Sequence, residues 1–194
     1  MTTTVSGIVS FVEHETTLGG VTTRVSGTVF GGQVMVAPIS ATEFQASITG
    51  GSLSAATSQT DNQSWVDIQA GGSVFALPWL AFQLGLDDRG YSGATGQQRW
   101  LSIAAGAEAR ASLFDGAARS IFRVSLLPLV DVTGQPRPDF AISVTTGFQL
   151  LRTPGAAAVL FSYERYDFPS TQAFGARRDQ VASLGLQVGV RFPK

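Results

Sequence analysis

The sequence has no cysteine, only one histidine and little charge. Charged residues make up 14% of the 194 residues, whereas a soluble globular domain usually carries about 25%. Without cysteine the chain can form neither a disulfide nor a thiolate metal site, and His14 alone cannot supply a three-ligand zinc site built from histidine and cysteine. We therefore expect no metal and no cofactor.

Long hydrophobic runs are also missing. The longest one, Val74 to Phe82, has nine residues and contains Pro78, whereas a membrane-spanning helix needs about 20. The first residues, Met1 to Thr4, have neither the basic start nor the apolar core of a signal peptide. If the protein is exported, we expect this sequence to be the mature form, with the signal peptide absent.

An excess of positive charge is lacking as well. Thirteen basic residues face fourteen acidic ones, and the formal net charge is -1. Because nucleic-acid binding calls for a clustered basic stripe, we expect no nucleic-acid partner. All basic residues except Lys194 are arginine. The planar guanidinium of arginine suits multiply hydrogen-bonded pairs with carboxylates.

What the sequence does contain is alternation of apolar and polar residues. Between Ala182 and Phe192 every second residue is apolar, and the residues between them are Ser, Gly, Gln and Arg. The same pattern follows Trp100, and shorter versions follow Val66, Leu80 and Phe140. A period of two predicts β-strands. Several of these segments exceed the five or six residues that are typical of strands in globular proteins.

Turn residues divide the alternating segments into ten predicted strands. Long connections at 14–20, 54–63, 88–98 and 168–179 alternate with shorter ones near Pro38, Pro78 and Pro154. Gly31 and Gly32 mark either a bulge inside one strand or a turn between two, so an eight-stranded alternative stays open. The predicted spans are about 3–13, 21–37, 43–53, 64–76, 79–88, 99–113, 119–131, 138–151, 156–167 and 179–192.

An even number of strands places both termini on the short-turn side, as transmembrane barrels of bacterial outer membranes require. The expected fold is therefore all-β, a single domain over residues 1–194 that forms an antiparallel up-and-down transmembrane β-barrel.

The polar face of the strands carries few charges, and they are balanced. A soluble barrel would have lysine and glutamate on this face, whereas here Ser, Thr, Gly and Gln dominate. Pairing inside a lumen avoids an uncompensated buried charge, which costs about 3–5 kcal/mol. Scattered surface charge is the alternative. The predicted lumen network consists of Arg24, Asp67, Asp87, Glu108, Arg110, Arg123, Glu164 and Arg191.

Aromatic residues near strand ends predict the two membrane interfaces. Tyr91, Tyr166 and Phe168 belong to the long-loop end of the same pattern. The residues predicted to lie at the interfaces are Phe44, Trp65, Trp79, Trp100, Phe140, Tyr163 and Phe192.

With these features the sequence resembles the small outer-membrane β-barrels of Gram-negative bacteria. The most specific segment is Leu184 to Phe192, which is similar to the terminal assembly signal of that class. Here Pro193 and Lys194 follow the closing aromatic residue. The resemblance implies location in the bacterial outer membrane, contact with the lipid bilayer and recognition by the barrel assembly machinery. It is a resemblance to the class, not to a subfamily.

The leading functional hypothesis is a barrel without catalytic residues and with a lumen largely filled by side chains, since about eight strands leave an interior that side chains just fill. Such a protein serves surface contact, envelope integrity or limited passage of small solutes. Three alternatives stay open: a narrow selective channel with Arg110 and Glu108 at its constriction, a lipid-modifying enzyme at the rim, and a soluble ligand carrier.

His14 is the only candidate base for the rim enzyme. It lies between Glu13 and Glu15, and no nucleophile or orienting partner is recognisable, so a solvated loop histidine is favoured. Ligand, oligomeric state and the choice between an adhesin and a structural barrel stay open. The arginines expected in or beside the long loops, either solvated or meeting phosphates of lipopolysaccharide, are Arg89, Arg99, Arg137, Arg177 and Arg178.

Overall fold

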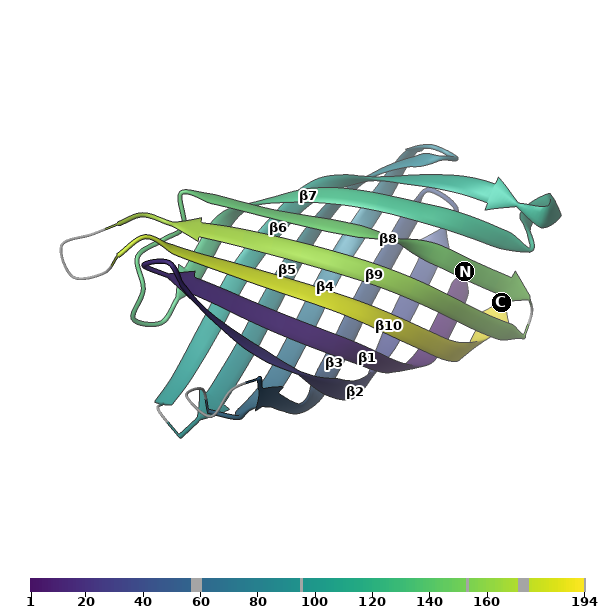
Figure 1. Cartoon of the computed structure of the whole chain (residues 1–194). Helices are drawn as coiled ribbons and strands as arrows, with labels where there is room; N and C mark the ends of the chain where they lie inside the picture. Colours follow the sequence, from purple (N-terminus) through teal and green to yellow (C-terminus); the bar gives the residue numbers. More distant parts are fainter. Residues whose placement is uncertain (57–60, 95, 153, 171–174, 194) are drawn as a thin grey trace.

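The computed structural model describes residues 1–56, 61–94, 96–152, 154–170 and 175–193, and these form ten strands and one short 3-10 helix (Figure 1). Parts of the predicted connections, residues 57–60, 95, 153 and 171–174, lie outside the described residues, as does Lys194. The elements are β1 (Thr2–Leu18), β2 (Val21–Ile39), β3 (Thr42–Ala55), β4 (Gln63–Leu77), β5 (Leu80–Gly93), β6 (Gly96–Leu113), η1 (Phe114–Gly116), β7 (Ala118–Val132), β8 (Phe140–Arg152), β9 (Gly155–Phe168) and β10 (Arg177–Pro193).

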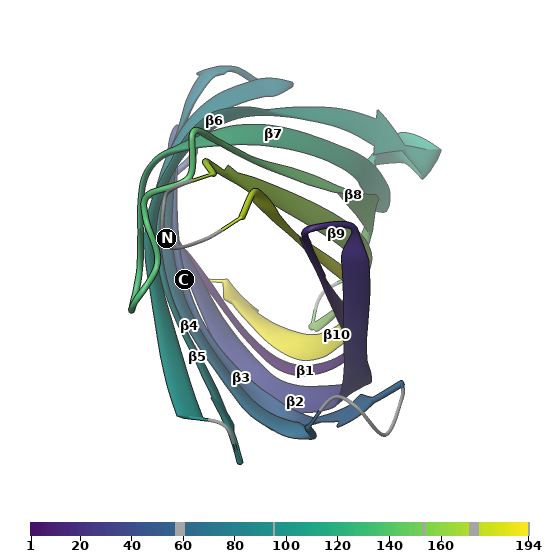
Figure 2. The same ribbon diagram turned by 60° about the vertical axis from the view of Figure 1, so that its left-hand side comes forward.

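The strands close into an antiparallel barrel. Each strand pairs with its neighbours in sequence, and β1 also pairs with β10, so the sheet has no free edge (Figures 1 and 2). Thr2 lies opposite Pro193, which puts both ends of the chain at one end of the barrel. We call this the turn-side end and the opposite one, where residues 133–139 connect β7 to β8, the loop-side end. The predicted ten-stranded transmembrane barrel fold is confirmed.

Alternation sorts the side chains to the two sides of the wall. Hydrophobic residues on the outer face are about half exposed, such as Phe82, Phe122 and Leu184 at 58%, 52% and 55%. Their partners on the inner face are mostly Ser, Thr, Gln, Gly and charged residues. This arrangement suits a wall in contact with lipid, and it argues against a soluble carrier with an apolar cavity. No helix within the described ranges is long and apolar enough to cross a membrane.

The strand 21–37 is continuous and part of β2, so the eight-stranded alternative is wrong. Gly31 pairs with both Ile8 and Thr49 inside the sheet. A Cβ atom added to Gly31 would lie only 1.9 Å from the backbone oxygen of Ile48. The glycine therefore permits close approach of β2 and β3 instead of marking a turn.

Two connections predicted to be long are tight hairpins. β1 continues through His14 to Leu18, and only Gly19 and Gly20 separate it from β2, with φ of 57° and 86°. Positive φ at both central residues is the requirement of the hairpin turn whose twist matches the strands. β5 likewise runs to Gly93 and β6 begins at Gly96. Charged residues that suggested loops are in fact strand residues.

Candidate functional site

The interior of the barrel holds two groups of charged side chains. At the turn-side end, Glu108 on β6 has a side chain that is 0% exposed and is surrounded by donors. Arg123 donates to its Oε2 from Nε at 2.9 Å and from Nη2 at 2.6 Å, and Gln83 donates to the same oxygen at 2.8 Å. Arg110 donates to Oε1. Glu108 therefore depends on two arginines from β6 and β7.

Arg110 links this carboxylate to a second one on β3. Its Nη1 and Nη2 donate to Glu43 at 2.9 and 2.6 Å, and its guanidinium lies 4.4 Å from the centre of the Phe75 ring. Arg119 approaches Glu43 at 4.0 Å, while Arg191 on β10 lies opposite Thr4 on the inner face. We call Glu43, Glu108, Arg110, Arg119, Arg123 and Arg191 the turn-side cluster.

Closer to the loop-side end, Arg89 on β5 lies among three carboxylates. Its Nη1 donates to Glu164 at 2.8 Å, its Nη2 donates to Asp87 at 3.0 Å, and its Nε lies 3.7 Å from Asp67. The guanidinium packs 4.8 Å from the centre of the Trp65 ring, and its side chain is 3% exposed. One cation thus serves three acids in a dry environment.

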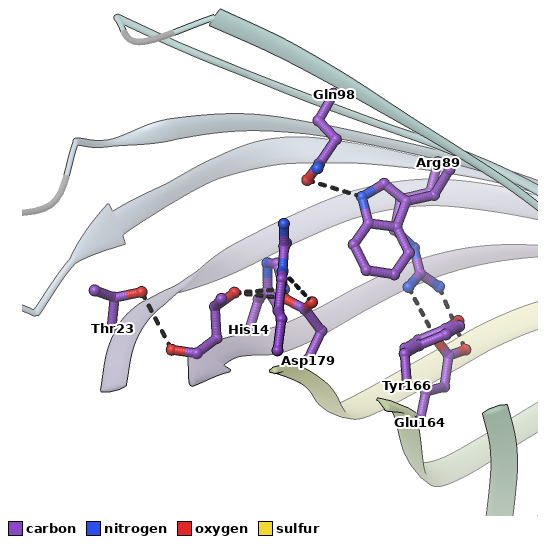
Figure 3. A network of polar contacts seen from close by, with 10 residues as sticks. His14, Thr23, Arg89, Gln98, Glu164, Tyr166 and Asp179 are labelled. Carbon is purple, nitrogen blue, oxygen red and sulfur yellow. Dashed lines mark hydrogen bonds and ion pairs between the residues drawn. The ribbon is translucent and has the colours of Figure 1, made fainter. Parts of the chain in front are cut away.

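His14 and Asp179 form a further pair beside Arg89, as Figure 3 shows. His14 Nε2 lies 3.0 Å from Asp179 Oδ1, and Arg177 donates to the same carboxylate from Nε and Nη2 at 2.5 and 3.0 Å. Thr16 also donates to Asp179 Oδ1, at 2.5 Å. We call His14, Asp67, Asp87, Arg89, Glu164, Arg177 and Asp179 the loop-side cluster.

Aromatic rings fill the lumen around the loop-side cluster. Trp100 makes edge-to-face contacts with Tyr166 and Phe168, at centroid distances of 4.9 and 5.8 Å. Tyr91 lies 5.1 Å from Trp65 and 4.9 Å from His14. None of these five aromatic side chains belongs to a residue more than 6% exposed. We call Trp65, Tyr91, Trp100, Tyr166 and Phe168 the aromatic plug.

A polar cavity of about 210 Å³ lies between the two clusters. Trp65, Arg89 and Glu164 line it on the loop side, and Glu43 and Arg110 on the turn side. The remaining wall combines apolar side chains, such as Ile8, Val29 and Ile121, with hydroxyl and amide side chains from all around the barrel, among them Ser6, Gln33, Ser47, Thr49, Gln69, Thr145, Gln149, Ser162, Ser183 and Gln187.

The structure places seven of the eight residues predicted for the lumen network on the inner face of the barrel, in two groups. Glu108, Arg110, Arg123 and Arg191 belong to the turn-side cluster, while Asp67, Asp87 and Glu164 belong to the loop-side cluster. Arg24 is an error: it lies outside the barrel, half exposed, and pairs with Glu15 at 2.7 Å and Glu13 at 3.5 Å. The alternation of β2 is offset by one residue from the assignment that placed Arg24 inside.

Several interior charged residues were not predicted as lumen residues, because strand ends were taken for loops. His14, Arg89, Arg177 and Asp179 are strand residues, and His14 and Asp179 are 6% and 0% exposed. The expectation of a solvated loop histidine is wrong. Extending the predicted strand 3–13 by one residue would have placed His14 on the inner face, and Asp179 is already the first residue of the predicted strand 179–192, on its polar face.

The aromatic predictions divide in the same way. Phe44, Trp79, Phe140 and Phe192 point outward and are 55%, 54%, 44% and 54% exposed, and Tyr163 lies on the outer face of β9. Their position at a membrane interface stays a prediction. Trp65 and Trp100 are both 3% exposed and lie in the aromatic plug, so their interface assignment is wrong. Both residues lie near strand ends but on the inner face, so their rings pack across the lumen and not against lipid.

Among the arginines expected near the loops, Arg89 and Arg177 lie inside the barrel. Arg99 and Arg178 are on the outer face and pair with Asp88 and Asp167 at 2.6 and 2.7 Å, and Arg137 is exposed in the 133–139 connection. Together with Arg24 and its partners, these outer pairs form a charged belt just beyond the apolar band.

No protein-family model matches the sequence, and no curated protein matches it either. The solved structures similar to the chain include bacterial outer-membrane proteins. The outer-membrane protease OmpT from Escherichia coli has a TM-score of 0.56 at 9% identity, covering 98% of this chain and 95% of its own. The translocator domain of the autotransporter NalP from Neisseria meningitidis has a TM-score of 0.49 at 14% identity, covering 100% and 89%.

The attachment invasion locus protein Ail of Yersinia pestis is similar over 97% of this chain and 98% of its own, with a TM-score of 0.40 and 10% identity. At such identities the likeness extends to the fold alone. From its closed antiparallel topology, its apolar outer face and its similarity to OmpT, the chain has the fold of the bacterial outer-membrane β-barrels.

Proposed function

We propose that this protein is an integral, non-catalytic outer-membrane barrel with a lumen closed at the loop-side end. The aromatic plug carries the proposal. Its rings come from β4, β5, β6 and β9 and meet across the lumen, and Arg177 from β10 packs 5.5 Å from the Phe168 ring. A lumen filled at this level blocks free passage, as side chains do in barrels of about eight strands.

The geometry of His14 supports a non-catalytic role. A histidine base needs its orienting carboxylate on one ring nitrogen and its nucleophile or water on the other. Here Asp179 at 3.0 Å and the hydroxyl of Thr16 at 3.4 Å both lie at Nε2. His14 therefore serves to pair Asp179 and to pack against Tyr91, instead of activating a nucleophile.

The proposed role lies at the wall and the outer rim, in surface contact or envelope integrity. The apolar outer face would contact the lipid bilayer, and the barrel assembly machinery would recognise the terminal strand β10. The charged belt at the loop-side end includes Arg24, Arg99 and Arg178, which are already paired with carboxylates. Phosphates of lipopolysaccharide would meet these pairs and the exposed Arg137.

Single-channel conductance in planar bilayers tests the closed lumen. We expect the refolded wild-type protein to insert without stable channels. The double variant Tyr91→Ala, Trp100→Ala removes two rings of the aromatic plug, so it should give stable openings.

The matched control is Trp79→Ala, because Trp79 lies on the outer face, 54% exposed, and should leave conductance unchanged. Stable wild-type openings that respond to Arg110→Ala would overturn the proposal and favour the narrow selective channel.

A further inference from the structure

The cavity between the two clusters has walls of opposite excess charge. On the loop side the charged side chains that line the cavity are Asp67 and Glu164 with one arginine, Arg89. On the turn side the ratio is reversed, because Glu43 lines the cavity together with two arginines, Arg110 and Arg123. The loop side of the wall therefore has one carboxylate in excess and the turn side one arginine in excess.

Polar atoms without a hydrogen-bond partner in the described part of the chain point to a ligand at the negative end. Nε1 of Trp65 is a buried atom of this kind. Oδ1 of Asp67 and Nε of Arg89 make no hydrogen bond either, although they form an ion pair at 3.7 Å, and all three residues line the cavity. Trp65 and Arg89 are 3% and 2% exposed. Buried polar groups normally have partners, so a ligand with its own donors and acceptors would complete them.

Strand geometry gives the length that such a ligand would need. Gln83 donates to Glu108 in the turn-side cluster, and Asp87 in the loop-side cluster follows it by four residues on β5. At about 3.3 Å per residue, this separation is about 13 Å along the strand. An extended peptide of three residues spans about 10 Å. The side chains of the two clusters can cover the remainder.

We propose that this cavity binds a small zwitterion of about tripeptide length, with its cationic group at Asp67 and Glu164 and its anionic group at Arg110 and Arg123. The hydroxyl and amide side chains of the wall would hydrogen-bond the uncharged middle of the ligand. This proposal does not depend on the lumen being closed. A barrel that conducts ions but has the same cavity would bind the same ligand.

The test is isothermal titration calorimetry with the full chain folded in detergent micelles. The probes are triglycine, its N-acetyl derivative, its C-terminal amide, and the doubly blocked N-acetyl amide. We expect triglycine to bind, each singly blocked form to bind about tenfold more weakly or worse, and the doubly blocked form not to bind.

Two variants separate the ends. Asp67→Asn should weaken binding of triglycine and of the cationic amide but leave the anionic N-acetyl form unchanged. Arg123→Gln should do the reverse. Ser47→Leu narrows the cavity without changing charge and should abolish all binding, and Arg24→Gln on the outer face is the control that should change nothing.

Heat-modifiable mobility on an unboiled gel verifies that each variant is folded. If Asp67→Asn does not fold, the four probes on the wild-type protein and on Ser47→Leu still decide the question. No binding of triglycine to folded wild-type protein, or equal binding of all four probes, would overturn the proposal. A negative result in the titration would not change the interpretation of the conductance experiment, and stable wild-type channels would not change the interpretation of the titration.

Discussion

At the loop-side end of the lumen four carboxylates share two arginines, whereas at the turn-side end three arginines share two carboxylates and a fourth, Arg191, lies on the same inner face. The surroundings differ as well. Arg89 packs against Trp65 of the aromatic plug, and its side chain is 3% exposed. Arg123 in the turn-side cluster is 25% exposed. The comparison teaches that ion pairs between the same residue types contribute unequally to stability. Removing one partner of a pair destabilises the protein more when the remaining charge is shielded from water.

The largest effect is expected for Arg89→Gln. The substitution leaves Asp67, Asp87 and Glu164 without their shared cation under the aromatic plug, and breaking such a buried pair costs about 3–5 kcal/mol. Urea unfolding of the micelle-bound barrel, followed by tryptophan fluorescence, measures the loss. A loss no greater than that of an outer-face variant would show that water reaches this cluster freely.

Arg123→Gln should destabilise the barrel by less. Glu108 loses Arg123 but keeps Arg110 and Gln83, so its carboxylate is not left without a cation, and we expect a loss of about 1.5–3 kcal/mol for the Arg123 contact as a whole. The same unfolding experiment applies, with Arg89→Gln in parallel. If the turn-side variant loses more stability than the loop-side one, the proposed ranking by burial is wrong.

The smallest effect is expected outside the barrel. Arg99→Gln removes the pair with Asp88, but the Arg99 side chain is 67% exposed, and exposed ion pairs contribute little to stability. We expect an unchanged urea midpoint at low and at high salt. A midpoint that falls in the variant, with the difference disappearing at high salt, would show that the charged belt contributes more than exposed pairs usually do.

The prediction from sequence succeeded where alternation was long and regular. β6 and β10 were predicted from their period of two, and with them the faces of Glu108 and Arg110. It failed where charge was taken as a sign of a loop, at His14, Arg89 and Arg177, and where a one-residue offset reversed Arg24. The sequence does not show on which side of the wall a charged residue near a strand end lies, since such a residue occurs both at the outer rim and in the lumen.

The sequence by itself determined that the chain forms ten long strands with one apolar and one polar face, because the alternation of apolar and polar residues can be read within each segment. The low content of charged residues distinguishes these strands from those of a soluble protein. Only the tertiary structure decided which inner residues meet. Closing the barrel brings Arg89 to Glu164, which is 75 residues away, and His14 to Asp179, which is 165 residues away. The separation of the charges into two clusters follows from register and closure, which are properties of the whole sheet.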